Sequence, residues 1–256
     1  MIKAGIDIGS RTVKLVTVAD GEITATRKAH NTYNPVAVAK MLLEGISYDR
    51  LTATGYGRHI IKKHIDCDIV SEIKAFASGV RAVFPECRAV LDIGGQDTKT
   101  SALSVDGRVL KFEMNDKCAA GTGRFIEVIA NAMDFSIEDF GVVALQAESV
   151  AKITNMCTVF AESEVISLIN NGAKRDEVAL GIHDAITRRV LTMLGRLPAF
   201  QNLVFAGGVA RNVCIRHLLQ QNLKIPVLVP DDPQIIGALG AALSNEVTPE
   251  QLPIFA

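Results

Sequence analysis

Apolar and polar positions recur in the same order in two parts of the chain. Residues 4–14 (AGIDIGSRTVK) and 89–99 (AVLDIGGQDTK) align without a gap and share Ala, Asp, Ile, Gly and Lys at corresponding positions. Each copy continues into an apolar segment and an Asp-Gly turn, at residues 20–21 and 106–107, which is typical of a hairpin. Because such internal similarity indicates duplication, the pattern predicts two β-meanders of strand, turn, strand, turn and strand.

Helical periodicity follows each meander. Apolar residues that recur every three to four positions predict helices over residues 35–46, 71–83, 122–133, 136–146, 160–170, 175–196, 210–221 and 234–244. Short apolar runs predict further strands over residues 51–54, 202–206 and 227–229. We therefore expect an α/β protein with two similar lobes, residues 1–87 and residues 88–256. Whether the last helix returns to the first lobe stays open.

Composition narrows the kind of protein. Of the 256 residues, 48% are hydrophobic and 21% are charged, which is the balance of a compact globular protein. The formal net charge is −1 and aromatic residues make up only 5%, so nucleic-acid binding is disfavoured. The apolar runs are short and interrupted by charge, and Asp7 falls where a signal peptide needs apolar residues. We expect a cytoplasmic protein with no nucleic-acid or membrane partner.

The two Asp-x-Gly turns, which begin at Asp7 and Asp92, suit phosphate chemistry. Glycine lets backbone N–H groups approach an anion, and an aspartate at the end of a strand can hold hydrated Mg²⁺ against the same phosphates. A single turn of this kind is usually only a turn. The duplication, together with Gly207 and Gly208 after a predicted buried strand, favours a nucleotide site.

The five cysteines form no CxxC pair and are odd in number, which disfavours a disulfide framework. Cys118 and Cys157 each precede a predicted helix, whose N-terminal dipole favours a thiolate. Two cysteines are too few for a cubane cluster, but a two-fold dimer supplies four. From spacing alone, buried small hydrophobic residues are the more common alternative.

These motifs resemble the superfamily of actin, sugar kinases and heat-shock chaperone ATPases, with the two phosphate loops at 7–14 and 92–99 and the adenosine motif at 204–212. The resemblance implies a duplicated ribonuclease-H-like fold, with ATP or ADP and Mg²⁺ in a cleft between the lobes, and Asp7 and Asp92 acting through the metal. It implies phosphate contacts from Gly9, Ser10, Arg11, Thr12, Lys14, Gly94, Gly95, Gln96 and Asp97, and adenosine contacts from Gly207 and Gly208.

Two of the implied roles have structural alternatives. Glu72 corresponds to a water-orienting glutamate of related phosphatases, which would make it catalytic. It is equally a carboxylate at a helix N-terminus, favoured there by the helix dipole. Lys14 is either a phosphate ligand or a solvated lysine on a strand.

The chain also resembles, from end to end, the activators of 2-hydroxyacyl-CoA dehydratases and the ATPase components of benzoyl-CoA reductases. The resemblance lies in DIGSRTVK, TGYGR, SEIKAFASG, DIGGQDTK, MNDKCAAGTGRFIE, CTVFAESEVISL and FAGGVARN. It implies a homodimer that shares one 4Fe-4S cluster through Cys118 and Cys157, whereas Cys67, Cys87 and Cys214 would be structural.

The implied activity is ATP-driven transfer of one low-potential electron to an iron–sulfur dehydratase, or to a benzoyl-CoA reductase or double-cubane-cluster protein. Ferredoxin or flavodoxin would be the donor. The short distance along the chain from the second phosphate loop to Cys118 leads us to expect that Gly121, Thr122 and Gly123 couple the two. A small-molecule kinase of the same fold and a nucleotide-dependent binding module without redox chemistry are the alternatives.

Overall fold

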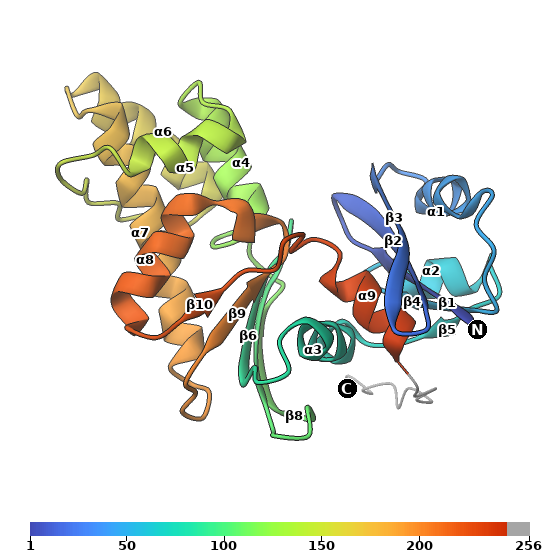
Figure 1. Ribbon diagram of the computed structural model, residues 1–256. Coiled ribbons are helices and arrows are strands. Elements are labelled where there is room, and N and C mark those ends of the chain that lie inside the picture. The colour runs from blue at the N-terminus through green and yellow to red at the C-terminus, as the bar shows by residue number, and fades with distance from the viewer. Residues whose placement is uncertain (245–256) are drawn as a thin grey trace, which may run out of the picture. The chain divides into compact units, whose positions relative to one another are not determined.

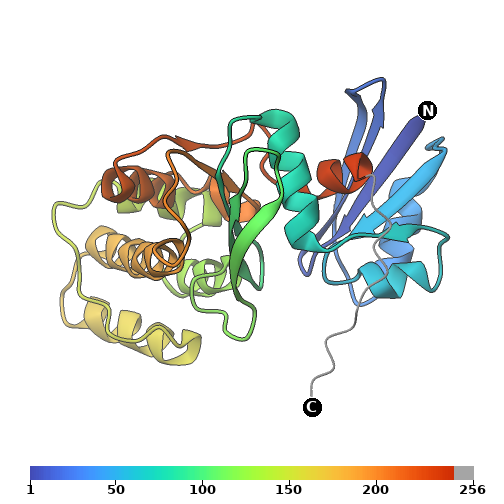
Figure 2. The ribbon, with the colours of Figure 1, turned by 90° about the horizontal axis from the view of Figure 1, so that it is seen from below.

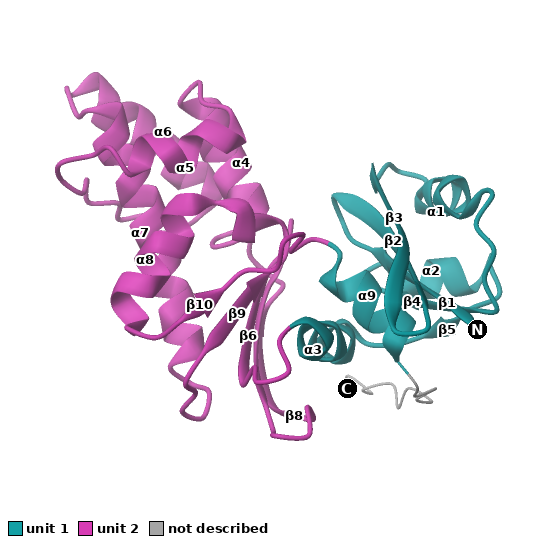
Figure 3. Ribbon diagram, viewed as in Figure 1, with its two compact units in different colours: residues 1–83, 235–256 teal, residues 84–234 magenta. Residues whose placement is uncertain are grey.

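The computed structural model describes residues 1–244 and divides the chain into two compact units (Figure 3). Unit 1 comprises residues 1–83 and the segment from residue 235 onward, and unit 2 comprises residues 84–234. The sequence expectation placed this division after residue 87 and left open whether the last helix returns to the first lobe. Residues 245–256 of the expected second lobe lie outside the described residues.

Unit 1 is built on a five-stranded sheet with the strand order β3-β2-β1-β4-β5 (Figure 1). The strands are β1 (Ile2–Ile8), β2 (Thr12–Ala19), β3 (Glu22–His30), β4 (Arg50–Thr54) and β5 (Asp68–Ile69). The first three form the antiparallel meander, and β4 and β5 add in parallel beside β1. The expected first meander is therefore confirmed.

The structure describes four helices in unit 1; three contact this sheet, and the third in chain order packs mainly on the last. They are α1 (Pro35–Leu43), α2 (Arg58–Lys62), α3 (Glu72–Val83) and α9 (Ile236–Leu243). Ile6 and Ile8 point into a core shared with α1 and α2, so the alternate residues of β1 face α9. A Cβ on Gly5 would lie 2.0 Å from the carbonyl oxygen of Ala238, so glycine is needed where α9 crosses this strand.

Unit 2 repeats the same topology. Its sheet has the order β10-β9-β6-β7-β8, with β6 (Ala89–Ile93), β7 (Thr98–Leu103) and β8 (Val109–Asn115) as the antiparallel meander. The strands β9 (Leu203–Ala206) and β10 (Val227–Leu228) add in parallel beside β6. The parallel strands stand in the same places as in unit 1, which confirms the duplicated α/β fold.

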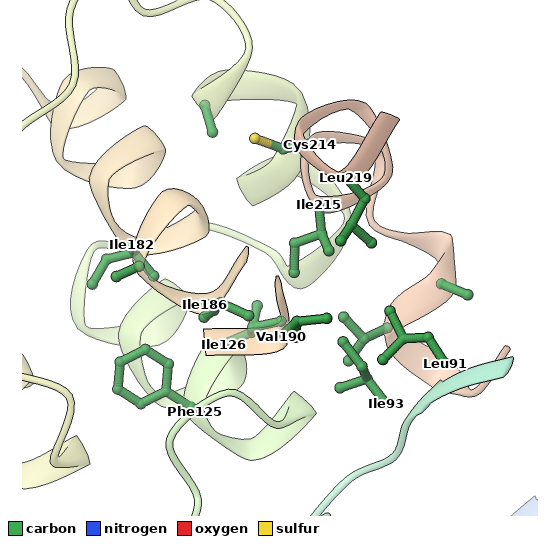
Figure 4. Close-up of a cluster of buried hydrophobic side chains, with 14 of the residues drawn as sticks. Leu91, Ile93, Phe125, Ile126, Ile182, Ile186, Val190, Cys214, Ile215 and Leu219 are labelled. Atoms are coloured by element: carbon green, nitrogen blue, oxygen red, sulfur yellow. The ribbon is translucent and has the colours of Figure 1, made fainter. Parts of the chain in front are cut away.

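The helices of unit 2 gather on one side of its sheet (Figures 1 and 2). They are α4 (Gly123–Ala132), α5 (Ile137–Ala144), α6 (Thr158–Asn170), α7 (Arg175–Leu194) and α8 (Val213–Leu223), with a 3₁₀ turn η1 (Gly208–Arg211). Leu91 and Ile93 of the central strand pack with Phe125, Ile186 and Ile215 of three of these helices in one buried cluster (Figure 4). This core holds the second meander against the helical layer.

Most expected elements are present, and the differences have local causes. The helix expected over residues 210–221 begins at Val213, because Asn212 caps it with a hydrogen bond from the backbone nitrogen of Ile215 to its side-chain oxygen. The short α2 and β5 were not expected, since five and two residues are too few to show a period. Over residues 1–244, no helix is both long and apolar enough to cross a membrane.

Candidate functional site

The first phosphate loop, residues 9–11, is the tight connection between β1 and β2. The backbone nitrogen of Gly9 donates to the carbonyl oxygen of Thr12 (3.1 Å), which closes the turn. Asn31 of the loop after β3 binds this turn. Its side-chain amide nitrogen donates to the carbonyl oxygen of Gly9 (2.7 Å), and its backbone nitrogen donates to the carbonyl oxygen of Arg11 (2.9 Å). Ser10 and Thr12 are partly exposed and Arg11 is exposed, so the loop has side chains and N–H groups available for a ligand.

Asp7, at the end of β1, is 5% exposed and lies beside Lys14. The two residues are cross-strand partners, and the Lys14 ammonium is 3.0 Å from Oδ2 of Asp7. Glycines line the rest of the carboxylate: a Cβ on Gly55 would lie 2.5 Å from Oδ1, and one on Gly237 would lie 3.3 Å from Oδ2. The aspartate therefore sits in a narrow slot with a cation as its neighbour.

Glu72 stands at the start of α3 and is linked to this slot through Arg58. The Arg58 guanidinium is 3.9 Å from Oε1 of Glu72 and donates to the carbonyl oxygen of Gly55 (3.1 Å), next to Asp7. Ser71, the residue before α3, accepts a hydrogen bond from the backbone nitrogen of Lys74 (3.4 Å). The structure thus connects Asp7 and Glu72 within unit 1 through Gly55 and Arg58.

The second phosphate loop, residues 94–97 between β6 and β7, repeats the first. The backbone nitrogen of Gly94 donates to the carbonyl oxygen of Asp97 (2.9 Å). Asp92 is 5% exposed, and the ammonium of its cross-strand partner Lys99 lies 3.8 Å from Asp92 Oδ2 and 2.5 Å from Asp97 Oδ2. Gly95 is half-buried and Gln96 exposed, so this turn also presents groups to solvent.

Gly207 is the counterpart of Gly55 in the duplicated fold. Both follow the strand parallel to the loop strand, with φ of +83° and +89°, a region that favours glycine. A Cβ on Gly207 would lie 2.3 Å from Oδ1 of Asp92, the same relation that Gly55 has to Asp7. Gly208 has more space, since a Cβ placed there would lie 3.5 Å from its nearest neighbour, the Gln234 side chain. Within unit 2, Gly207 therefore shapes the carboxylate slot and Gly208 is the more open of the pair.

A buried histidine supports the segment after Gly208. His183 Nδ1 donates to the carbonyl oxygen of Ala179 (2.7 Å), so Nε2 accepts from the amide nitrogen of Asn212 (2.9 Å). Complete burial lowers the pKa of His183 from 6.5 to about 4, against the opposing effect of its hydrogen bond to Ala179. The neutral imidazole thus orients the Asn212 side chain, which caps α8.

The two candidate ligand cysteines are both exposed and both lie in unit 2. Cys157 is the N-cap residue of α6, and Cys118 lies in the loop that leads to Thr122, the N-cap residue of α4. The helices α4 and α6 pack against each other. We define the cysteine loop as residues 116–121.

The second phosphate loop is bonded directly to the start of α4. The backbone nitrogens of Gly123 and Arg124 donate to the carbonyl oxygens of Gly94 and Gly95, both at 2.9 Å. A Cβ on Gly123 would lie 3.0 Å from the Gly94 oxygen, so the close approach depends on glycine. The second phosphate loop and the helix that follows the cysteine loop are therefore joined by backbone hydrogen bonds.

The segment before Cys157 is held by Glu164 of α6. The Glu164 carboxylate accepts from the backbone nitrogens of Thr154 and Asn155, both at 2.8 Å, and from the side chains of the same two residues at 2.6 and 3.0 Å. Partial burial acts to raise the pKa of Glu164, but these hydrogen bonds lower it below its ordinary value. The carboxylate form is therefore the one that orders this segment.

The other cysteines are buried. Burial raises the pKa of the Cys67 thiol, and it raises that of Cys214 to about 12. Thiols of this kind stay protonated and are poor metal ligands.

The donor groups fit the cofactors that the sequence leads us to expect. The buried carboxylates of Asp7 and Asp92 are hard oxygen ligands suited to Mg²⁺. The exposed thiols of Cys118 and Cys157 are soft ligands suited to iron–sulfur chemistry. Within residues 1–244, no three His, Cys, Asp or Glu side chains form a group that could hold a metal ion. A chain that supplies two of four cysteines forms no such group by itself.

Sequence reasoning missed several residues of these loops. Gly55 and Arg58 belong to the TGYGR stretch, but nothing along the chain indicated that Gly55 borders Asp7 or that Arg58 links Gly55 to Glu72. Lys99 and Asn115 were likewise overlooked, although Lys99 is the repeat of Lys14 and that repeat was a usable signal.

Comparison with known proteins agrees with this geometry. The fold is that of the actin-like ATPases: a ROK family glucokinase from Streptomyces griseus, solved with glucose and AMPPNP, superposes with a TM-score of 0.60 at 13% identity, covering 94% of this chain and 98% of that one. The chain belongs to the BadF/BadG/BcrA/BcrD ATPase family, whose model matches residues 4–244.

Relatives within this family are similar over nearly their whole length. The 2-hydroxyisocaproyl-CoA dehydratase activator of Clostridioides difficile is 40% identical over 253 residues, covering 95% of this chain and 94% of the relative. The solved activator from that organism, with bound ADPNP, has a TM-score of 0.86 at 39% identity and covers 95% and 93% of the two chains. Component A of the (R)-2-hydroxyglutaryl-CoA dehydratase of Acidaminococcus fermentans has a TM-score of 0.88 at 35% identity, with 95% and 96% covered. The resemblance drawn from the sequence motifs is confirmed.

Proposed function

We propose that this protein is the ATP-dependent activator of a 2-hydroxyacyl-CoA dehydratase. In this role it hydrolyses ATP and passes one low-potential electron, taken from a reduced ferredoxin or flavodoxin, to an iron–sulfur enzyme. The similarity to named dehydratase activators over almost the whole chain supports the class of partner. A short phosphate loop in each unit supports nucleotide binding.

The two loops would contact one ATP molecule. The phosphate contacts would be those that the resemblance implies. They come from Gly9, Ser10, Arg11, Thr12 and Lys14 in unit 1 and from Gly94, Gly95, Gln96 and Asp97 in unit 2. Asp7 and Asp92 would hold Mg²⁺ against these phosphates. Gly208 is the more accessible of the two glycines proposed for adenosine, while Gly207 allows the backbone to pass the Asp92 carboxylate.

Glu72 would orient the attacking water. Its link through Arg58 to the carbonyl oxygen of Gly55 connects it to the Asp7 slot, and it is partly exposed. A carboxylate at that place can accept a proton from water as the water attacks the terminal phosphate. The hydrolysed bond is the one between the β- and γ-phosphates of ATP, and its products are ADP and phosphate.

Cys118 and Cys157 would hold the iron–sulfur centre. A 4Fe-4S cluster bound by these residues from each of two protomers supplies a one-electron carrier of low potential. The exposure of both thiols suits ligands that are completed by a second copy of the chain. The protein would thus be a cytoplasmic homodimer whose further partner is a protein, with no role for nucleic acid or membrane.

The observation that carries this proposal is the pair of hydrogen bonds from the start of α4 to Gly94 and Gly95. Any shift of the second phosphate loop on binding or hydrolysis of ATP moves the helix that follows Cys118. Such a connection supports nucleotide-controlled electron transfer, because ATP can act on the cysteines only through contacts that differ between its bound and hydrolysed states.

The test is iron and sulfide analysis of protein purified without oxygen, with Cys118→Ser and Cys157→Ser as variants. We expect about four irons per dimer in the wild type and none above background in either variant, because each change removes two of four ligands. Cys67→Ala, a buried cysteine, is the matched control and should keep its iron. An iron-free wild type that still hydrolyses ATP would move the assignment to a kinase or a nucleotide-dependent binding module.

A further inference from the structure

Four successive carbonyl groups of the cysteine loop are each held by a side chain. The Asn115 amide nitrogen donates to the carbonyl oxygens of Cys118 and Ala120, both at 3.0 Å. The hydroxyl of Thr122 donates to Ala119 (2.7 Å), and the buried hydroxyl of Thr98 donates to Gly121 (2.7 Å). Loops are usually more mobile than the elements they connect, whereas hydrogen bonds to four successive carbonyl oxygens restrict this loop to a single conformation.

Two of these side chains come from the strands next to the second phosphate loop. Thr98 is the first residue of β7, directly after that loop, and Asn115 is the last residue of β8. The two residues are cross-strand partners. A displacement of residues 94–97 therefore reaches Thr98 through one peptide bond and Asn115 through the ladder.

Asn115 is itself oriented by Arg189 of α7. The Arg189 guanidinium donates to Oδ1 of Asn115 (3.3 Å), which leaves the amide nitrogen directed at the two carbonyl oxygens. The Arg189 side chain also lies against Gly121: a Cβ there would be 3.1 Å from Arg189 Cδ, and its φ of +83° favours glycine. The loop is thus confined on both sides.

We propose that Thr98 and Asn115 are positioning residues that transmit the nucleotide state of the second phosphate loop to Cys118. They act in addition to the backbone contacts of Gly123 and Arg124, which hold the helix after the cysteine loop. Asn115 holds the carbonyl oxygen of Cys118 itself, and Thr98 holds the end of the same loop at Gly121. The inference rests on the proposed function, because it requires that ATP binds at residues 94–97.

The test measures the reactivity of the Cys118 thiol in the iron-free full-length protein. Under anaerobic, iron-free conditions, the rate of alkylation by iodoacetamide is followed at Cys118 by peptide mass spectrometry, with and without the ATP analogue ADPNP and Mg²⁺. Cys118 is exposed, so the reagent reaches it. We expect ADPNP to change this rate about fivefold or more, which is the range of typical coupling between sites.

The variants separate coupling from folding. Thr98→Val removes the donor with little change of shape, and Asn115→Asp replaces the donor with an oxygen that repels the two carbonyl oxygens. In both, we expect the ratio of rates with and without ADPNP to fall to about one. Thr98→Ser keeps the hydroxyl and should keep the ratio.

Thr100→Val is the matched control. Thr100 lies on the same strand, is fully buried, and its hydroxyl has no hydrogen-bond partner among the residues that the structure describes. It should keep the wild-type ratio. Retention of the ratio in Thr98→Val and Asn115→Asp would overturn the inference.

Binding of ADPNP, measured on the same samples by calorimetry, distinguishes this inference from the proposed function. Wild-type protein that binds ADPNP without any change at Cys118 would overturn the coupling and leave the proposed function in place. Wild-type protein that does not bind ADPNP would overturn both.

Discussion

Single residues close to Asp7 and Asp92 shape the two loops proposed to bind phosphate. Asp7 and Asp92 each have a cross-strand lysine at their side and a glycine of positive φ against Oδ1. Mg²⁺ can take the place of the lysine ammonium beside such a carboxylate. The flexible lysine side chain can then turn toward a phosphate. The same side-chain set in both repeats points to one shared task.

The segment before Cys157 leads to a prediction about Glu164. Glu164→Gln removes the charge that four hydrogen bonds stabilise, so we expect the iron-free protein to lose about 1–2 kcal/mol of unfolding free energy at pH 7. The folded-state pKa is lowered, so this stability is present above the ordinary value of 4.5 and is lost as pH falls through the folded pKa.

The measurement is urea unfolding at several pH values between 7 and 3.5. The difference between wild type and Glu164→Gln should shrink at the acid end. Glu162→Gln, on the same helix, is the control and should follow the wild type. A constant difference across this range would show that the carboxylate charge is not what holds the segment.

At the scale of elements, each unit has its own sheet of the same topology, and the two units differ in their helices. Both sheets place two parallel strands beside an antiparallel meander in the same order. In unit 2, the chain between β8 and β9 adds α4 to α7, and these helices carry or flank both exposed cysteines. The duplicated part is therefore the one proposed for nucleotide binding, and the inserted part is the one proposed for electron transfer.

The contact of α7 with α8 leads to a second pH prediction. His183 has a folded-state pKa of about 4 against an ordinary 6.5, so the unfolded chain takes up a proton first as pH falls. From pH 7 to pH 5, we expect a loss of about 2 kcal/mol in unfolding free energy from this residue. His183→Gln, which cannot titrate but can still accept from Asn212, should lack this part of the loss in urea unfolding. Equal losses in both proteins would contradict it.

At the scale of the whole molecule, the chain is nearly neutral and each unit brings one phosphate loop. If one ATP engages both loops, the two repeats should matter equally. We expect ADPNP with Mg²⁺, at about 100 times its Kd, to stabilise the wild type by about 2.7 kcal/mol. Asp7→Asn and Asp92→Asn should each lose most of this stabilisation and slow ATP hydrolysis, with the unliganded fold intact.

Thermal unfolding with and without ADPNP, together with a phosphate-release assay, checks this prediction. Asp231→Asn, an exposed residue, is the control and should match the wild type in both. Full ATPase activity in Asp7→Asn would remove that residue from the mechanism, and an effect confined to one aspartate would contradict the equivalence of the repeats.

The meanders, the phosphate loops and the position of Cys157 at a helix start could be predicted because their causes are local. A turn of three or four residues, a period of two and a helix start are all set by neighbours in the chain. Helix α2 was missed because its pattern is shorter than the window that reveals a period.

The surroundings of the key residues depended on contacts between distant segments. Gly55 reaches Asp7 only because β4 pairs in parallel with β1, and Arg189 reaches Asn115 from a helix far along the chain. Parallel pairing and helix packing are selected by burial of apolar surface over the whole unit. The amino-acid pattern thus predicted the two Asp-x-Gly turns and the helices that begin after Cys118 and Cys157. Only the tertiary packing decided that both thiols are exposed and which side chains connect the second turn to Cys118.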